Sequence, residues 1–294
     1  MFQGFTRRRI ATSGAEINLR VGGEGPPLLL LHGFPQSHVC WHRVAPELAR
    51  SFTVVATDLR GYGDSAKPPD DADHVAYSKR AMARDQVEVM SALGFNAFFL
   101  AGHDRGGRVA QRLVLDHGER VLRLAMLDIV PTLSVVEAMD LSVATDFYHW
   151  LFLSQPGGLP EHFIGFDPDF FLRRQLATWG ATEGAFVPDA FAEYQRCFRN
   201  PAAIAAMCAD YRAALTIDLS HDRAGREAGE RIGCPLLALW ARHGVMARHF
   251  DVLQCWREVA DAVYGEAIDC GHFLAEEQPE ATVAALTDFF NAAC

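Results

Sequence analysis

One carboxylate stands in a glycine-rich stretch at the expected junction of a strand and a helix. Asp104 lies in LAGHDRGGRVA, residues 100–110, after an apolar run at 97–100 and before a segment with helical spacing. The pattern is G-x-D-x-G, whereas the related G-x-S-x-G motif carries a serine at the tip of a sharp strand-to-helix turn. Glycines at 102, 106 and 107 allow the backbone to close around the side chain. The stretch therefore predicts a carboxylate nucleophile, which would form an ester with its substrate.

Such an ester needs a histidine that activates water, and the histidine needs an acid partner. His272, in DCGHFLAEEQPE, follows the last predicted strand. For the acid there are two candidate positions. The residues after the strand at 235–240 are ARHGVM, without a carboxylate, whereas Asp128 follows the strand at 123–127. We therefore expect Asp128 to be the acid; the alternative is that it only caps a turn ahead of Pro131.

Two further features belong to the same predicted site. The segment HGFPQ follows a strand, so the backbone N–H groups of Phe34 and of Arg105 could form an oxyanion hole. Arg105 and Arg108 lie one helical turn apart beside Asp104, and guanidinium groups bind carboxylates by bidentate hydrogen bonds. The arginines thus point to a substrate that is itself a carboxylate; the alternative is one or two surface salt bridges.

Composition limits the classes of function. The 294 residues carry a formal net charge of −10, which disfavours nucleic acid and anionic membrane surfaces as partners. The seven cysteines are scattered, without a C-x-x-C pair, and are expected to be reduced thiols of a cytoplasmic protein. No apolar run reaches the ~18 residues of a spanning helix, and no apolar signal segment follows the N-terminal arginines.

Short apolar runs alternate with helical segments, which predicts an α/β fold with a mostly parallel central sheet flanked by helices. Between about 132 and 226 the pattern changes to aromatic-rich helices, so we expect an inserted helical cap at 132–226 on a core formed by 1–131 and 227–294. Helices are expected at 41–48, 85–93 and 282–290. Strands are expected at 17–21, 28–31, 52–56, 97–100, 123–127, 235–240 and 262–268.

Taken together, HGFPQ, DLRGYGDS, GHDRGGR, the YHW at 148–150, ADYRA and CGHF make the chain resemble the fluoroacetate dehalogenases of the α/β-hydrolase superfamily. The resemblance implies that haloacetates are hydrolysed to glycolate and halide, without a metal or an organic cofactor, by a homodimer. It makes Asp104 the nucleophile, His272 the base and Asp128 its partner. Arg105 and Arg108 would bind the substrate carboxylate. The halide would be bound by His149, Trp150 and Tyr211, which otherwise read as core aromatics.

Two alternative functions remain. An epoxide hydrolase also uses an aspartate nucleophile, but it needs cap tyrosines to protonate the opening ring, and the two arginines argue against it. A non-catalytic ligand-binding protein on the same fold would not need the Asp104, Asp128 and His272 set. Halide release from haloacetates would separate all three functions.

Overall fold

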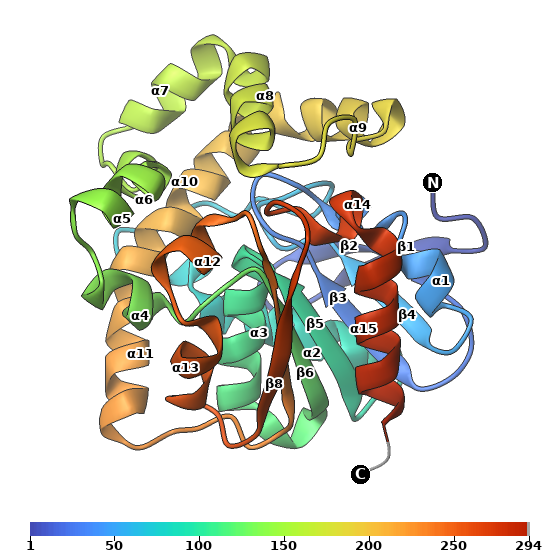
Figure 1. Ribbon diagram of the computed structural model, residues 1–294. Coiled ribbons are helices and arrows are strands. Elements are labelled where there is room, and N and C mark those ends of the chain that lie inside the picture. The colour runs from blue at the N-terminus through green and yellow to red at the C-terminus, as the bar shows by residue number, and fades with distance from the viewer. Residues whose placement is uncertain (293–294) are drawn as a thin grey trace.

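An eight-stranded sheet forms the centre of the computed structural model, which describes residues 1–292 (Figure 1). The strands follow one another in the spatial order β1-β2-β4-β3-β5-β6-β7-β8. Their bounds are β1 Thr6–Ala11, β2 Glu16–Gly22, β3 Pro27–Leu31, β4 Thr53–Thr57, β5 Phe98–His103, β6 Val121–Leu127, β7 Leu236–Ala241 and β8 Val263–Ile268.

Six neighbouring strands are parallel, namely β4, β3, β5, β6, β7 and β8. Strands β1 and β2 extend the sheet in antiparallel pairing. Runs such as Leu28 to Leu31 are buried because helices cover both faces of this part of the sheet. The order reverses around β3, since β4 lies on one side of it and β5 on the other. Loops after neighbouring parallel strands meet at one edge, and such a reversal point is where open α/β sheets bind ligands.

Helices of the core lie on both sides of the sheet. Because crossovers between parallel strands are right-handed, the connection from β3 to β4 places α1 on one face of the sheet. The connections in the opposite direction, from β4 to β5 and from β5 to β6, place α2 and α3 on the other face. Helix α1 contacts α15, and α2 packs against α3. The core helices are α1 Ala45–Leu48, α2 Lys79–Ala92, α3 Arg105–Asp116, α12 Val245–His249, α13 Val252–Arg257, α14 Leu274–Glu277 and α15 Pro279–Asn291. Short 3-10 turns form η1 His38–Trp41, η2 Val75–Tyr77 and η3 Gly118–Arg120.

Between β6 and β7 the chain forms eight successive helices. Their upper members, α7 to α9, lie above the sheet in Figure 1, and α9 contacts η1 while α10 contacts η2. The predicted division into a core and a cap at 131/132 and 226/227 stays a prediction. The helices are α4 Thr132–Glu137, α5 Leu141–Asp146, α6 Tyr148–Leu153, α7 Leu159–Phe166, α8 Pro168–Trp179, α9 Pro188–Phe198, α10 Pro201–Leu215 and α11 Ile217–Glu227.

The predicted α/β fold class is confirmed, with two local differences. Strand β1 was not expected, because TRRRIA is polar and lies exposed at the edge of the sheet, where no apolar alternation is needed. The helix expected at 41–48 is divided into η1 and α1, with Pro46 in the first turn of α1, where it needs no N–H partner. No helix within residues 1–292 is long and apolar enough to cross a membrane.

Candidate active site

Asp104 occupies the tight turn between β5 and α3. Its backbone has φ 48° and ψ −116°, a strained conformation that non-glycine residues rarely adopt. Glycine is required around it, because a Cβ on Gly106 would lie 2.4 Å from the carbonyl oxygen of His32, and one on Gly33 would lie 2.5 Å from the Cβ of Asp104. Helix α3 therefore begins directly against the loop that follows β3, and the carboxylate stands at the carboxyl edge of the sheet.

A backbone N–H group holds this carboxylate. The N–H of Phe34 donates to Oδ1 of Asp104 at 2.8 Å. Burial alone would raise the pKa of Asp104, but His272, Arg105 and the hydrogen bond from Phe34 hold it below its usual value. Asp104 is therefore an anion at neutral pH, as an attacking carboxylate must be. The N–H of Arg105, in the first turn of α3, stays a predicted second donor.

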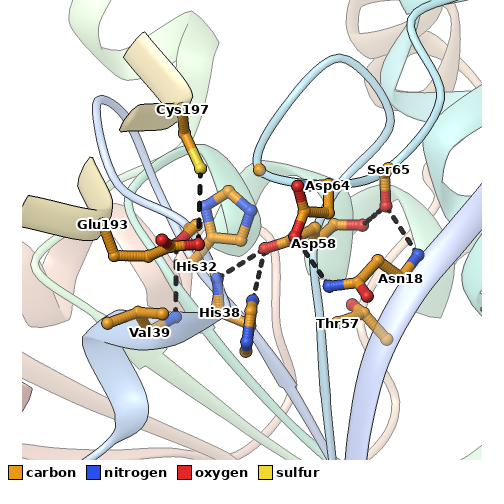
Figure 2. A network of polar contacts seen from close by, with 12 residues as sticks. Asn18, His32, His38, Val39, Thr57, Asp58, Asp64, Ser65, Glu193 and Cys197 are labelled. Atoms are coloured by element: carbon orange, nitrogen blue, oxygen red, sulfur yellow. Dashed lines mark hydrogen bonds and ion pairs between the residues drawn. The ribbon is translucent and has the colours of Figure 1, made fainter. Parts of the chain in front are cut away.

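The loop after β3 is kept in place by a buried polar network around Asp58, the residue that follows β4. Asp58 accepts hydrogen bonds from the backbone N–H groups of His38 and Asp64 at 2.8 and 2.9 Å, and its carboxylate also contacts the His38 ring (Figure 2). The His32 ring accepts the N–H of Leu59 at 3.1 Å. Loops after β3 and β4 are thus joined by hydrogen bonds.

His272 and Asp128 form a close pair. Nδ1 of His272 lies 2.6 Å from Oδ2 of Asp128, and the N–H of Ala241, the last residue of β7, donates to Oδ1 at 2.9 Å. Burial alone would lower the pKa of His272, but the hydrogen bond and charge of Asp128 raise it. The end of β7 contributes a backbone donor to Asp128, and the loop after it contributes no acid.

The His272 loop is hydrogen-bonded to the end of α8. The N–H of His272 donates to the carbonyl oxygen of Trp179 at 2.9 Å, and a ring nitrogen of His103 lies 2.8 Å from the carbonyl oxygen of His272. Buried Glu277 accepts hydrogen bonds from four backbone N–H groups on both sides of this junction, namely those of Ala181, Thr182, Gly271 and Phe273. The position of the imidazole therefore depends on the end of α8.

The two arginines are buried but differently engaged. Arg105 donates from Nε and Nη2 to the carboxylate of Asp210 on α10, so this edge of its guanidinium is not free for a substrate. Arg108 donates from Nη1 to Thr132, while its Nε and Nη2 have no hydrogen-bond partner within residues 1–292. Binding of a substrate carboxylate by both arginines stays a prediction, and for Arg105 only Nη1 is without a partner in the same part of the chain.

The expected halide-binding residues come from two of the helices between β6 and β7. His149 and Trp150 lie on α6 and Tyr211 lies on α10, with the His149 and Tyr211 ring centroids 5.8 Å apart. The guanidinium carbon of Arg108 lies 4.6 Å from the centre of the Trp150 ring. Burial lowers the pKa of His149 to about 3, so its imidazole is neutral, and its Nδ1 has no partner in the described part of the chain.

A cavity brings most of these side chains together. It has a volume of about 560 Å³ including its open mouth. Among its lining residues are Asp104, Arg108, His149, Trp150 and His272. Buried Arg105 and Tyr211 stack on each other, with the Arg105 guanidinium 4.2 Å from the Tyr211 ring centre. No group of three His, Cys, Asp or Glu side chains among the described residues could hold a metal ion.

Two residues at the candidate site were not predicted from the sequence. The Trp179 ring lies 4.6 Å from the His149 ring and 5.5 Å from the His272 ring, centroid to centroid. Nothing in the local pattern distinguishes Trp179 from other aromatic residues of the helical region. Asp210 did carry a signal, because it is an acid within the apolar segment IAAMCADYRAAL and a buried acid needs a partner.

Comparisons with known proteins identify the family. A family model described as alpha/beta hydrolase fold matches residues 26–279. The chain belongs to the α/β-hydrolase family. A fluoroacetate dehalogenase from Burkholderia sp is 46% identical over 99% of this α/β hydrolase and 95% of that protein, which confirms the resemblance seen in the motifs.

Other members of the family are also similar to this α/β hydrolase. A soluble epoxide hydrolase from Corynebacterium sp. (strain C12) is 35% identical, with 97% of each chain covered. Among solved structures, the α/β hydrolase ALR0039 from Nostoc sp PCC 7120 is 54% identical and covers 100% of both chains, with a TM-score of 0.98.

Proposed function

We propose that this α/β hydrolase removes the halogen from short 2-halocarboxylates, converting fluoroacetate or another haloacetate into glycolate and halide through an ester on Asp104. One observation carries the proposal. The Nε and Nη2 edge of Arg108 is buried and has no partner in residues 1–292, and Arg108 lines the same cavity as Asp104. A buried cation with two unpaired donors favours a carboxylate in the cavity, because leaving these donors unsatisfied is costly.

In the first step the carboxylate oxygen of Asp104 attacks the α-carbon. A C–O bond forms, the carbon–halogen bond breaks, and the halide leaves with the electron pair. Arg108, assisted by Nη1 of Arg105, holds the substrate carboxylate so that the α-carbon faces Asp104. N–H and O–H groups of His149, Trp150 and Tyr211 stabilise the departing anion in a cavity with little water.

In the second step His272 takes a proton from water, and the resulting hydroxide attacks the carboxyl carbon of the ester. The N–H groups of Phe34 and Arg105 stabilise the oxyanion. As the intermediate collapses, the glycolate alkoxide takes the proton from His272, and the new Asp104 carboxylic acid loses its proton to solvent. Asp128 keeps the His272 imidazole in the required tautomer and stabilises its charged form.

The proposal is tested by measuring fluoride release from fluoroacetate and chloride release from chloroacetate, with glycolate identified as the second product. We expect both reactions in the natural protein and neither in the Asp104→Ala variant. Full turnover in Asp104→Ala would exclude the ester mechanism.

A second candidate is epoxide hydrolysis, which the 35% identity to the Corynebacterium protein favours. Ring opening would require a cap tyrosine as acid. Tyr148 is partly exposed and bonded to Gln175, and the ring of Tyr211 is stacked with Arg105. Diol formation from styrene oxide without halide release from haloacetates would replace our proposal with this one. If neither product forms while acetate binds, the chain is a non-catalytic ligand-binding homologue.

We further propose that residues 132–226 form a cap on the core and that the protein is a homodimer. Several large apolar side chains on cap helices are exposed, namely Leu141, Phe163, Phe166 and Phe170. Exposed apolar groups of this kind mark interaction surfaces. Sedimentation of the natural protein and of Phe166→Ser tests the dimer, which the variant should weaken.

A cytoplasmic location is proposed because the six cysteines among the described residues are free thiols. Cell fractionation tests this location, and recovery of the protein outside the cytoplasm would exclude it.

A further inference from the structure

Asp210 is a fully buried carboxylate on cap helix α10 that receives donors from three other parts of the chain. The hydroxyl of Tyr62 donates to Oδ2 at 2.7 Å. Arg105 donates from Nε to Oδ2 at 2.9 Å and from Nη2 to Oδ1 at 2.7 Å. The ammonium group of Lys79, at the start of α2, also bonds to Oδ1.

The charges in this cluster balance. Lys79 has a second acidic partner, because Oδ2 of Asp218 lies 3.3 Å from its Nζ. Two cations, Arg105 and Lys79, therefore face two anions, Asp210 and Asp218. Burial alone would raise the pKa of Asp210, but the charges of Arg105 and Lys79 hold it well below its usual range. Asp210 thus stays ionised and offsets positive charge beside the candidate carboxylate site.

Asp210 also determines which part of Arg105 is available. It occupies the Nε and Nη2 edge, its neighbour Tyr211 covers one face of the guanidinium at 4.2 Å, and Nη1 alone is left without a partner in residues 1–292. Both constraints come from α10, whereas the backbone of Arg105 belongs to α3. The cap helix therefore sets the direction of this guanidinium.

Arg108 has the complementary arrangement. Thr132 binds its Nη1, the Trp150 ring lies against its face, and its Nε and Nη2 edge is open. Burial and the neighbouring charge of Arg105 lower the pKa of Arg108 to about 10, so it remains a cation at neutral pH. A carboxylate can bind bidentately to Arg108 and accept one further hydrogen bond from Arg105.

We propose that Asp210 is a positioning residue of the carboxylate site, which withdraws the fork of Arg105 so that Arg108 alone holds the substrate bidentately. This inference rests on the proposed function. If Arg105 were free to compete for the carboxylate, the substrate would be held more tightly but turned away from the line of attack by Asp104. Small displacements of a reacting carbon slow a reaction strongly.

The test compares Asp210→Asn with Asp218→Asn. Both variants remove one buried carboxylate from Lys79, but only Asp210 contacts Arg105. Calorimetric titration with acetate gives the dissociation constant and the number of intact sites, and chloride release from chloroacetate is then expressed per site. For Asp210→Asn we expect acetate to bind about threefold more tightly, because the fork of Arg105 is released and can bind the carboxylate as well, and turnover per site to fall about 10- to 100-fold.

Damaged folding would not produce these opposite changes, because it would not increase the affinity for acetate. Asp218→Asn should leave both quantities near those of the natural protein. Weaker acetate binding in Asp210→Asn, or unchanged turnover per site, overturns the proposal while leaving dehalogenation intact. If the natural protein releases no halide, the proposed function fails, and the acetate titration alone decides on Asp210.

A second variant guards against failure of Asp210→Asn to fold. Tyr62→Phe removes one donor to Asp210 and keeps every charge of the cluster. We expect its turnover per site to fall about threefold, with the acetate dissociation constant unchanged, because one hydrogen bond to a charged group is lost. Natural turnover in Tyr62→Phe overturns the proposal.

Discussion

Nδ1 of His272 lies 2.6 Å from Oδ2 of Asp128, and these two residues follow β8 and β6, with β7 between them in the sheet. The N–H of Ala241, at the end of β7, occupies the other oxygen of Asp128. Because Nδ1 faces a carboxylate, it carries a proton in the resting state, and Nε2 is the nitrogen that can accept one from water. The pair therefore has a definite pH dependence.

Turnover should rise with pH through the pKa of His272. His272 acts as a base only when neutral, and Asp128 raises its pKa above the usual value of about 6.5. The pKa of Asp104 is lowered, so this carboxylate stays ionised and does not produce the acidic limb. In Asp128→Asn the limb should move to lower pH, and the maximal rate should fall by about 10² to 10⁴. Rate profiles of halide release between pH 4 and 9 measure both effects.

A matched control is Asp269→Asn. Asp269 lies in the same loop as His272 but is exposed and bonded to His243. We expect its profile to coincide with that of the natural protein. An acidic limb that stays in place in Asp128→Asn would show that His272 is not the base.

Removing the base should trap the ester. In His272→Gln the first step proceeds and releases one halide per site, but no group activates water for the second step. Mass spectrometry of the protein after exposure to chloroacetate should show an added carboxymethyl group on the peptide that contains Asp104. The double variant Asp104→Asn/His272→Gln should show none. Steady turnover by His272→Gln would contradict the two-step scheme.

The parts of the site that could be predicted from sequence are those that follow strands. Phe34, Asp104 and Asp128 each come directly or nearly directly after a buried apolar run, and parallel strands deliver such residues to one edge. The acid partner of His272 could also be chosen from sequence. The segment ARHGVM after β7 contains no acid, which left Asp128. The structure places these three loops together, as the local pattern indicates.

Residues that come from the helices between β6 and β7 were harder to predict. Trp179 reaches His272 and His149 only because α8 ends at the His272 loop. Trp179 and His272 are more than 90 residues apart in the sequence. The bonds from Arg105 on α3 to Asp210 on α10 likewise join residues 105 positions apart in the sequence. Helical spacing gives the direction of a side chain on its own helix, but tertiary packing decides which group it meets.

Arg108→Lys should weaken binding of haloacetates. Lysine keeps the positive charge but cannot offer the planar Nε and Nη2 edge, so we expect KM for chloroacetate to rise about 10- to 100-fold. The neutral substrate chloroacetamide should be affected much less, because it lacks the carboxylate. Arg112→Lys is the control, since Arg112 is also buried, on the same helix, and does not line the cavity with Asp104. Equal losses on both substrates would contradict carboxylate binding by Arg108.

Trp150→Phe should slow the release of fluoride more than that of chloride. Phenylalanine keeps an aromatic ring against the Arg108 guanidinium but removes the indole N–H, one of three expected donors to the halide. Fluoride is small and strongly hydrated, so its departure into a cavity with little water depends more on each hydrogen bond than that of chloride. We expect the ratio of fluoride to chloride turnover to fall about tenfold, the effect of one hydrogen bond to a charged group.

Trp41→Phe, a change at a buried tryptophan of η1 outside the cavity, should leave the ratio unchanged. Equal slowing of both halides in Trp150→Phe would mean that Trp150 supports Arg108 and does not bind the leaving ion.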